Sequence, residues 1–510
     1  MPSPRHRAAL LVAALVVFAA CVSQAASPPP STPSPVVTPP PTPTPTLVPT
    51  PTPVPRIDVP LAVVTGFTNL KDAVTEAEVR AAMEADTIIQ PCELFTAVNP
   101  VPRCLPAPEI ATHLSANPLD LAMLPAGLVQ PATKVLPVDG ADLFGGAEAR
   151  SLPYPFHTTV DASMGWAPYV RAEIRTVISP GNSCPDRGPA YAAITLGRGW
   201  DWVFGGGTAV YNGFNAPGGV STVNVVPTGN EGAVAALMRS GDLTYAEQEC
   251  PFVSNFRVNN GTVFTIDPAV IPLFRDTYGV DVMPFAANHP FDQGEAGFLE
   301  SLDHIAAAGL PTTGAGRTLD EALTPAFFED DGLTFAFVAH NGIPGPVPAA
   351  PDQPGVAWLT DENVFESVAR ARAGADVVFC VPQWWGGAEY HYDWRDPMRH
   401  QQAVYLEAGC DHVLGQGTHY SGPIDWTTDA DGRLHLTVVS SGNFMFGQGW
   451  SQDTMEGVIF ELTFRGAELV QVRMHPYVTL DQAQINLTDP EGDGHYVLDR
   501  IFEWSPEPPP

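Results

Sequence analysis

Basic residues are scarce in this sequence. Its 510 residues include 24 Lys and Arg against 56 Asp and Glu, which gives a formal charge of -32. Nucleic acids and anionic membrane surfaces carry dense negative charge, so this composition disfavours both as partners. Long apolar runs are also lacking after the N-terminal segment, since no later stretch reaches the roughly 20 residues that cross a bilayer. We therefore expect an acidic globular part with no nucleic-acid partner.

The N-terminal segment has the order of a secretory signal. Basic side chains occupy residues 5–7, an uncharged apolar run follows over 8–20, and the run ends in Ala-Ala-Cys21. The run is too short to span a membrane, and this order of charge and small residues is typical of a cleaved signal. The ending resembles a bacterial lipobox, which implies removal of residues 1–20 and lipidation of Cys21. Ordinary cleavage near Ala26 without a lipid is the alternative. We expect an extracytoplasmic protein, lipid-anchored to the bacterial membrane at the cell surface.

Charge is absent from residues 28–55, which consist mostly of Pro, Thr, Ser and Val. Proline removes backbone donors and favours the extended polyproline form, so we predict a disordered, proline-rich stalk over 21–55 that acts as a spacer. About 455 residues follow, enough for about two or three domains with their own cores.

The chain contains seven cysteines, and six remain once Cys21 is set apart. An even number in an exported protein indicates disulfides, although sequence alone leaves many pairings open. We favour Cys92–Cys104, which closes a short loop, Cys184–Cys250, which would join two of the loops described below, and Cys380–Cys410.

The remaining chain divides into three parts. Residues 56–170 alternate strand-like and helix-like segments and predict a small α/β domain of unknown role, with strands near 61–64 and 119–124 and a helix over 73–85 capped by Thr75. Residues 171–480 predict a larger α/β domain. Residues 481–510 form an acidic tail that ends in prolines and is expected to be loosely ordered.

The larger domain shows apolar strand-like runs separated by helical stretches. The strands are expected at 176–178, 334–338, 376–379 and 436–439, and the helices at 295–308 and 362–373. Several of these runs end in clusters of Gly, Asn, His and Trp, and sites on α/β sheets lie in loops at strand ends. The clusters cover residues 180–188, 241–251, 286–294, 383–390 and 415–419, with 440–446 following.

In order and spacing, these clusters resemble the capsule-synthesis family (CapA, or PgsA of poly-γ-glutamate synthesis), which belongs to the calcineurin-like metallophosphatase superfamily. The resemblance covers about residues 171–475. Its most specific parts are Asn288-His289 with Asp292, Gly294 and the Gly314-Ala315-Gly316 turn, then Trp385-Gly386 with Glu389-Tyr390, then Ser441-Gly442-Asn443-Phe444 with Phe446. It implies a four-layer αββα sandwich.

The resemblance also implies a site with one or two divalent metal ions, Mn, Zn or Fe. Two metals about 3.5–4 Å apart clamp an oxyanion and activate a bound water, using Asp, Asn and His ligands from several loops. The positions that match as metal ligands are Asn182, Glu249, Asn288, His289 and His419, with Glu247 as an added carboxylate. Three expected ligands are replaced, because an Asp falls on Asn182 and two His fall on Trp384 and Gly417. A weaker single-metal site, or a pocket without metal, therefore stays open.

Further residues are candidates for catalysis and substrate binding. His289 is the expected catalytic residue, because an amide and an imidazole side by side are unusual in a purely structural turn. Arg187, Trp385, Glu389 and Asn443 are candidate substrate-binding residues, although Asn443 also suits a turn and the aromatic residues near Trp385 also suit packing.

Three functional hypotheses follow. One is a metal-dependent phosphoesterase or a transferase that makes or processes capsule or a poly-γ-glutamate-like polymer. The second is a catalytically degenerate scaffold that binds such a polymer, and the third is solute binding by residues 56–170. The expected partners are the membrane, through the lipid on Cys21, and an anionic or sugar polymer of the envelope. The sequence indicates no particular protein partner.

Overall fold

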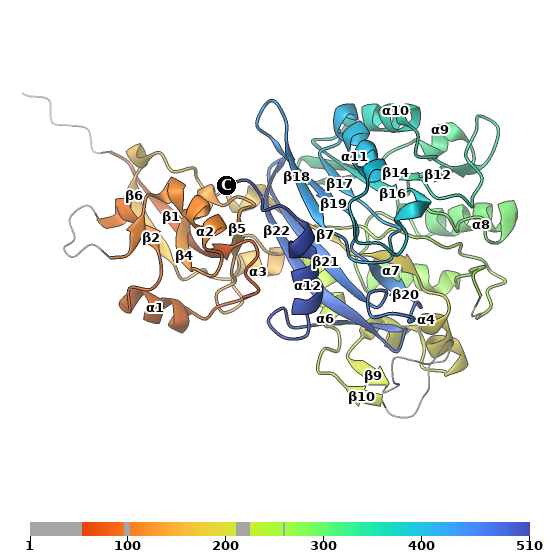
Figure 1. Cartoon of the computed structure of the whole chain (residues 1–510), viewed down its shortest axis with the longest axis horizontal. Helices are drawn as coiled ribbons and strands as arrows, with labels where there is room; N and C mark the ends of the chain where they lie inside the picture. The colour runs from red at the N-terminus through yellow and green to blue at the C-terminus, as the bar shows by residue number, and fades with distance from the viewer. Residues whose placement is uncertain (1–53, 96–101, 211–224, 259–260) are drawn as a thin grey trace, which may run out of the picture. The chain divides into compact units, whose positions relative to one another are not determined.

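A computed structural model describes residues 54–95, 102–210, 225–258 and 261–510 (Figure 1). The signal segment, Cys21 and nearly all of the stalk lie outside these residues. Val54–Pro510 forms one compact unit by its internal contacts. Within the described ranges, none of the helices combines the length and the apolar character needed to cross a membrane.

The first large sheet has five strands in the order β11-β7-β21-β22-β23. Their bounds are Leu243–Thr244, Ile174–Ser179, Glu456–Arg465, Glu468–Leu480 and Gln484–Leu487. β7 runs parallel to β11 and antiparallel to β21, which continues through a tight hairpin into β22. Because β7 and β11 are parallel, their carboxyl ends lie at the same edge of this sheet.

The second large sheet has six strands in the order β13-β14-β16-β17-β19-β18. Their bounds are Ala326–Asp330, Leu333–Asn341, Val377–Gln383, His412–Leu414, Leu434–Val438 and Ile424–Thr428. The four central strands are parallel, and β13 and β18 are antiparallel edges. The central strands are nearly all buried because both faces are covered, which explains their continuous apolar runs.

The two sheets pack face to face. Val177 and Phe460 from the first sheet share a core with Phe337 and Phe379 from the second. Side chains alternate along a strand, so Ile459 points to the opposite face of the first sheet. Helices cover both outer faces, which confirms the expected αββα sandwich.

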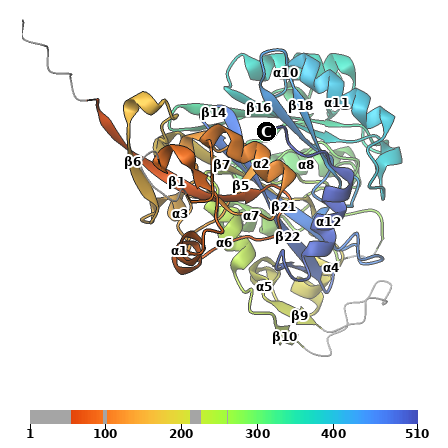
Figure 2. The same cartoon turned by 60° about the vertical axis from the view of Figure 1, so that its left-hand side comes forward.

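The covering helices come from different parts of the chain. On the five-stranded sheet lie α5 (Trp200–Gly205), α6 (Ala233–Ser240), α7 (Ile271–Asp276) and α8 (Gly294–Ala307). On the six-stranded sheet lie α10 (Asp361–Arg372) and α11 (Asp396–Ala408), and both views show them beside β14 and β16 (Figures 1 and 2). The expected strands and helices of this region are all present, and their bounds agree to within about two residues except that β14 and β16 end three and four residues later than expected.

Residues 56–170 form a smaller sheet that is antiparallel throughout. Its strand β1 (Arg56–Gly66) pairs with β4 (Ala122–Pro125), β5 (Thr133–Val135) and β6 (His157–Asp161). The expected helix is α1 (Glu76–Glu84), and Thr75 caps it with Glu78 as its capping-box partner. The second predicted strand begins at Ala122, later than the expected residue 119, because Leu119 is largely exposed and contributes no core face.

This smaller sheet is joined to the five-stranded sheet by buried polar contacts. The backbone N–H of Val135 donates to Gln471 Oε1 at 2.8 Å, and Arg473 Nη2 donates to Asp142 Oδ2 at 2.8 Å. Arg150 donates to both carboxylate oxygens of Asp242 at 2.8 and 2.9 Å. The apolar core around β1 also includes residues of β7 and β22.

The tail is ordered, contrary to our expectation. Helix α12 (His495–Trp504) buries Val497, Leu498 and Ile501 against the core between the two sheets. The ring of Phe502 meets that of Phe67 at 5.8 Å. An amphipathic face hidden in an acidic segment explains the difference, since its apolar residues recur at helical spacing.

The remaining elements are short, and all three predicted disulfides are present. The short helices are α2 (Ile110–Ala116), α3 (Ala147–Ser151), α4 (Gly188–Ala190) and α9 (Leu319–Ala322). The short strands are β2 (Gln90–Pro91), β3 (Cys104–Leu105), β8 (Asn182–Cys184), β9 (Thr208–Val210), β10 (Val225–Pro227), β12 (Ala315–Gly316), β15 (Gly355–Val356) and β20 (Asn443–Phe446). The disulfides Cys92–Cys104, Cys184–Cys250 and Cys380–Cys410 confirm the pairings favoured from the sequence.

Candidate functional site

The loops singled out in the sequence meet at one edge of the sandwich. β8, which follows β7, pairs in parallel with β20, so that Asn182 lies opposite Asn443. The backbone of Ser183 forms an isolated parallel β-bridge with that of Gln248. Gln383, at the end of β16, forms another with Gln416, which follows β17. The carboxyl ends of parallel strands thus gather these loops, where α/β sheets place their ligand sites.

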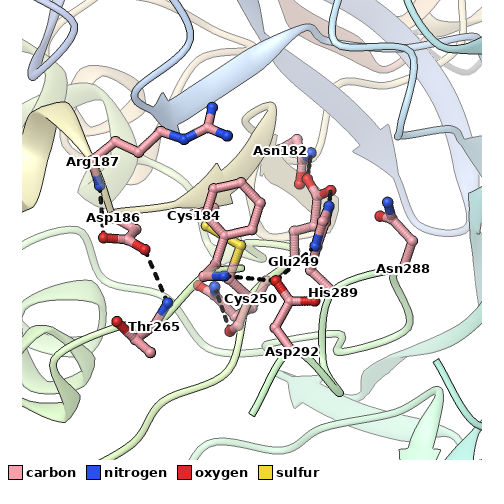
Figure 3. The surroundings of a disulfide bond; sticks show 12 residues. Asn182, Cys184, Asp186, Arg187, Glu249, Cys250, Thr265, Asn288, His289 and Asp292 are labelled. Carbon is pink, nitrogen blue, oxygen red and sulfur yellow. Dashed lines mark hydrogen bonds and ion pairs between the residues drawn. A yellow bond between two sulfur atoms is a disulfide. The ribbon is translucent and has the colours of Figure 1, made fainter. Parts of the chain in front are cut away.

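The first two loops are joined by the Cys184–Cys250 disulfide (Figure 3). Next to it, the side-chain amide of Asn182 donates to Glu249 Oε2. The other carboxylate oxygen of Glu249 lies 3.8 Å from His289 Nε2. Glu249 is fully buried, so the disulfide and the Asn182 amide fix a negative charge beside the imidazole.

His289 is held from its other side by Asp292, as Figure 3 shows. Its Nδ1 lies 2.9 Å from Asp292 Oδ2, which also accepts the backbone N–H of Phe264 at 2.7 Å. Burial lowers the pKa of His289, but the hydrogen bond to Asp292 and the charge of Glu249 outweigh it, so this pKa lies above its ordinary value. The imidazole therefore holds its proton more strongly than a free imidazole, with one carboxylate hydrogen-bonded to it and a second nearby.

Glu247 lies on the same loop as Glu249 but in a different environment. It is buried, and neither of its carboxylate oxygens has a hydrogen-bond partner among the described residues. Burial and then the charge of Glu249 raise the pKa of Glu247 well above its ordinary value. The Glu247 carboxyl therefore holds its proton more strongly than an exposed carboxyl does.

His419 forms the opposite side of the site. Its Nδ1 lies 2.8 Å from Asn443 Oδ1, and its Nε2 lies 3.7 Å from Glu389 Oε1. Burial lowers the pKa of His419, but Glu389, Glu249 and Asn443 raise it by more, so the net shift is upward. Asn443, a predicted substrate-binding residue, orients this ring and donates to Gln448 and Thr454.

The other predicted binding residues lie at the rim. Glu389 is partly exposed beside His419. The guanidinium of Arg187 lies over the ring of Phe264 at 4.6 Å and of Trp450 at 6.0 Å, and its Nε donates to the Gly261 carbonyl. Trp385 is exposed, and its indole packs over Gly387.

The chain resembles known proteins across this loop cluster. Residues 203–448 match the family described as "Bacterial capsule synthesis protein PGA_cap". This part of the chain is similar to that family. The chain is 30% identical over 175 residues to "PGA biosynthesis protein CapA" of Bacillus subtilis (strain 168), which covers 34% of this chain and 44% of the relative. It is 24% identical over 204 residues to "Capsule biosynthesis protein CapA" of Bacillus anthracis, which covers 38% and 47%. The chain thus spans about half the length of these relatives.

Two solved structures share weaker likeness. A hypothetical protein from Thermus thermophilus has 16% identity and a TM-score of 0.32, with 49% of this chain and 92% of that chain covered. A 5'-nucleotidase precursor from the same organism has 12% identity and a TM-score of 0.35, with 65% and 58% covered. The layers and strand order of the chain itself establish its fold.

Two positions at which the resemblance to the capsule-synthesis family implies His ligands hold Trp384 and Gly417 instead. Trp384 is fully buried in the core under α11, where its Nε1 donates to the Val439 carbonyl at 2.7 Å. Gly417 adopts a φ of +86°, and a Cβ there would lie 2.7 Å from the Gln383 side chain. Neither position can provide a ligand, and the side chain of Gln383 fills the space beside Gly417.

Sequence reasoning missed Gln383. It donates from Nε2 to Asn288 Oδ1 at 3.2 Å, which joins the fourth loop to the third. The signal for it was present, because Gln383 follows Phe379 and Val381 at intervals of two along β16 and shares their face. Asp292 was expected only as part of a motif, and its hydrogen bond to His289 was not foreseen.

A dinuclear metal cluster does not fit these residues. The two imidazoles approach different carboxylates, and Asn182 already donates to Glu249. Within the described ranges, no group of three or more His, Cys, Asp or Glu side chains is arranged to hold a metal ion. What the site offers instead is buried oxygen atoms without partners among the described residues, from Asn182, Glu247, Glu249, Gln383 and Gln416. Such oxygens call for hydrogen-bond donors or a cation.

Proposed function

We propose that this protein is an accessory protein in the synthesis or handling of an envelope polymer, and that its loop cluster binds a polymer unit without hydrolysing it. The observation that carries this proposal is that two positions expected to hold His ligands hold other residues. One is Trp384, which is buried in the core, and the other is Gly417. The retained Glu249, His289 and His419 keep a polar, hydrogen-bonded site in the place of a metal cluster.

An active metal-dependent phosphoesterase is the second candidate. The retained Asn288-His289 pair, with the His289 imidazole beside the Glu249 carboxylate, favours it. Measurement of metal content and hydrolysis separates the two candidates. For the purified full chain supplied with millimolar Mn, Zn or Fe, we expect fewer than two metals per chain. We also expect no hydrolysis of p-nitrophenyl phosphate above the buffer rate.

His289→Ala and His304→Ala form the matched pair for this experiment, because His304 lies on the surface of α8 away from the loop cluster. Two bound metals per chain, with hydrolysis that His289→Ala abolishes and His304→Ala leaves intact, would establish the phosphoesterase and refute the binding role.

We further propose that the protein is tethered outside the cytoplasm through a lipid on Cys21, with the proline-rich segment as a spacer. The basic, apolar and Ala-Ala-Cys order of residues 5–21 supports this location. A single cysteine carries the proposed attachment, so Cys21→Ser is expected to move the protein from the membrane fraction to the soluble extracytoplasmic fraction. Cys21→Ser protein that still sediments with membranes would contradict the lipid anchor.

A further inference from the structure

We propose that three aromatic residues at the mouth of the site, Tyr390, Tyr420 and Trp450, form a sugar-binding surface, called here the aromatic rim. It would take a pyranose ring of an envelope glycan, and the inference rests on the binding function proposed above. The three residues come from separate loops, after β16, β17 and β20. Tyr390 contacts the ring of Trp450 at 5.7 Å and that of Tyr420 at 5.9 Å, both at steep angles.

The aromatic rim exposes more ring surface than packing requires. Trp450 is 57% exposed and Tyr390 is 38% exposed. One face of Tyr390 is stacked on the imidazole of His419, with ring centres 5.1 Å apart and planes 22° apart. This places solvent-exposed rings next to the buried polar groups. Aromatic rings combine a large apolar face with a polar tip, and the C–H face of a pyranose is apolar while its edge carries hydroxyls.

The backbone at this place adopts conformations that side chains avoid. Tyr390 has a φ of 58° and His419 a φ of 62°, and Arg187 across the rim has a φ of 51°. The other non-glycine residues with positive φ in the described chain are Asp or Gln. Such conformations are energetically costly and cluster at ligand sites. The tyrosine and the histidine are stacked on each other, so both are held in place for contact with a ligand.

Polar groups around the aromatic rim match the hydroxyl edge of a sugar. The side chain of Glu389 is about a third exposed and lies beside His419, the residue on which Tyr390 stacks. The side chain of His289 is about a fifth exposed and lies beside Glu249. The guanidinium of Arg187 lies over the ring of Trp450 at the same rim. Carboxylates accept from hydroxyls, and a guanidinium can pair with a single acidic substituent on a sugar.

Charge favours a glycan over poly-γ-glutamate as the occupant. The chain carries a formal charge of -32, and Glu249, Glu389 and Asp292 all lie around the site. A polymer with one carboxylate in every unit would bring like charges against these groups, whereas a neutral or weakly acidic glycan would not.

Binding by the full chain tests the proposal. We would titrate it by calorimetry with a hexasaccharide of N-acetylglucosamine, a hexasaccharide of glucose and a hexamer of γ-linked glutamate. We expect at least one hexasaccharide to bind more tightly than the glutamate hexamer. Trp450→Ala should weaken that binding at least about tenfold, because it removes an aromatic face from the contact, and Trp450→Phe should weaken it less.

Trp504→Ala is the matched control, because Trp504 is similarly exposed but lies on α12. It should leave sugar binding unchanged. The proposal is overturned if neither hexasaccharide binds, if Trp450→Ala binds as the parent does, or if the glutamate hexamer binds most tightly. These outcomes are separate from the metal and hydrolysis results, because a non-hydrolytic protein that binds no sugar would still satisfy the proposed function.

Discussion

Replacing Cys184 and Cys250 together with alanine is expected to lower the free energy of unfolding by about 4 kcal/mol. The two cysteines are 66 residues apart, and a cross-link of that span removes considerable entropy from the unfolded chain. The same bond joins the loop of Asn182 to the loop of Glu249, so its loss also frees the two sides of the site. Urea unfolding at pH 7.5, followed by circular dichroism, measures the change.

The Cys92–Cys104 disulfide provides the control, because it spans 12 residues. Its double alanine variant should lose about 3 kcal/mol, since the entropic effect grows slowly with loop length. A loss for the Cys184–Cys250 pair that is equal to or smaller than this one would contradict the expected order.

Acid should destabilise the protein through two fully buried histidines, His340 and His412. Burial lowers the pKa of His340 to about 4 and that of His412 to about 3, against an ordinary value near 6.5. Below pH 6.5 the unfolded chain binds protons that the folded chain does not bind. The stability that these residues contribute is therefore complete above pH 6.5 and is lost as the pH falls toward 4. Each of the two histidines should lower the free energy of unfolding by about 1.4 kcal/mol for every pH unit in that window.

His340→Gln isolates one of these contributions. His340 Nδ1 lies 2.9 Å from the Tyr405 hydroxyl, and its Nε2 lies 3.0 Å from Ser367 Oγ, so the residue is hydrogen-bonded while neutral. Between pH 7.5 and 4.5 the variant should lose about 2–3 kcal/mol less than the parent protein in urea unfolding. His400→Gln, at an exposed site, should behave as the parent does. An identical pH dependence in the parent and the His340→Gln variant would show that His340 does not carry the effect.

The fold of the large domain was accessible from sequence because its central strands are buried on both faces. Runs such as Phe335–Val338 are apolar without interruption, and the helices between them show their own spacing. The smaller sheet was harder to predict, since the strands that pair with β1 are short and the pairing of β1 with β6 joins residues about 100 positions apart. The tail was mispredicted because its apolar residues are few and acidic ones surround them.

The candidate site was predicted in its loops but not in its contacts. The resemblance to the capsule-synthesis family implied Asn182, Glu249, His289 and His419, and the structure brings all four to one edge. The raised pKa of Glu247 depends on burial by distant segments, and the contact of Gln383 with Asn288 depends on two loops 95 residues apart. Such relations arise only in the folded chain, where tertiary packing decides them.

The packing of Phe67 against Phe502 joins a segment near the start of the folded region to a segment near its end. The hydroxyl of Thr68 also donates to Glu507 at 3.3 Å, so the segment after β1 is completed by residues more than 430 positions later. A polypeptide is made from its N-terminus, so its early segments emerge first. The segment after the first strand therefore keeps part of its apolar surface uncovered until the last helix arrives. A chain stopped before α12 would leave that surface open to chaperones and proteases.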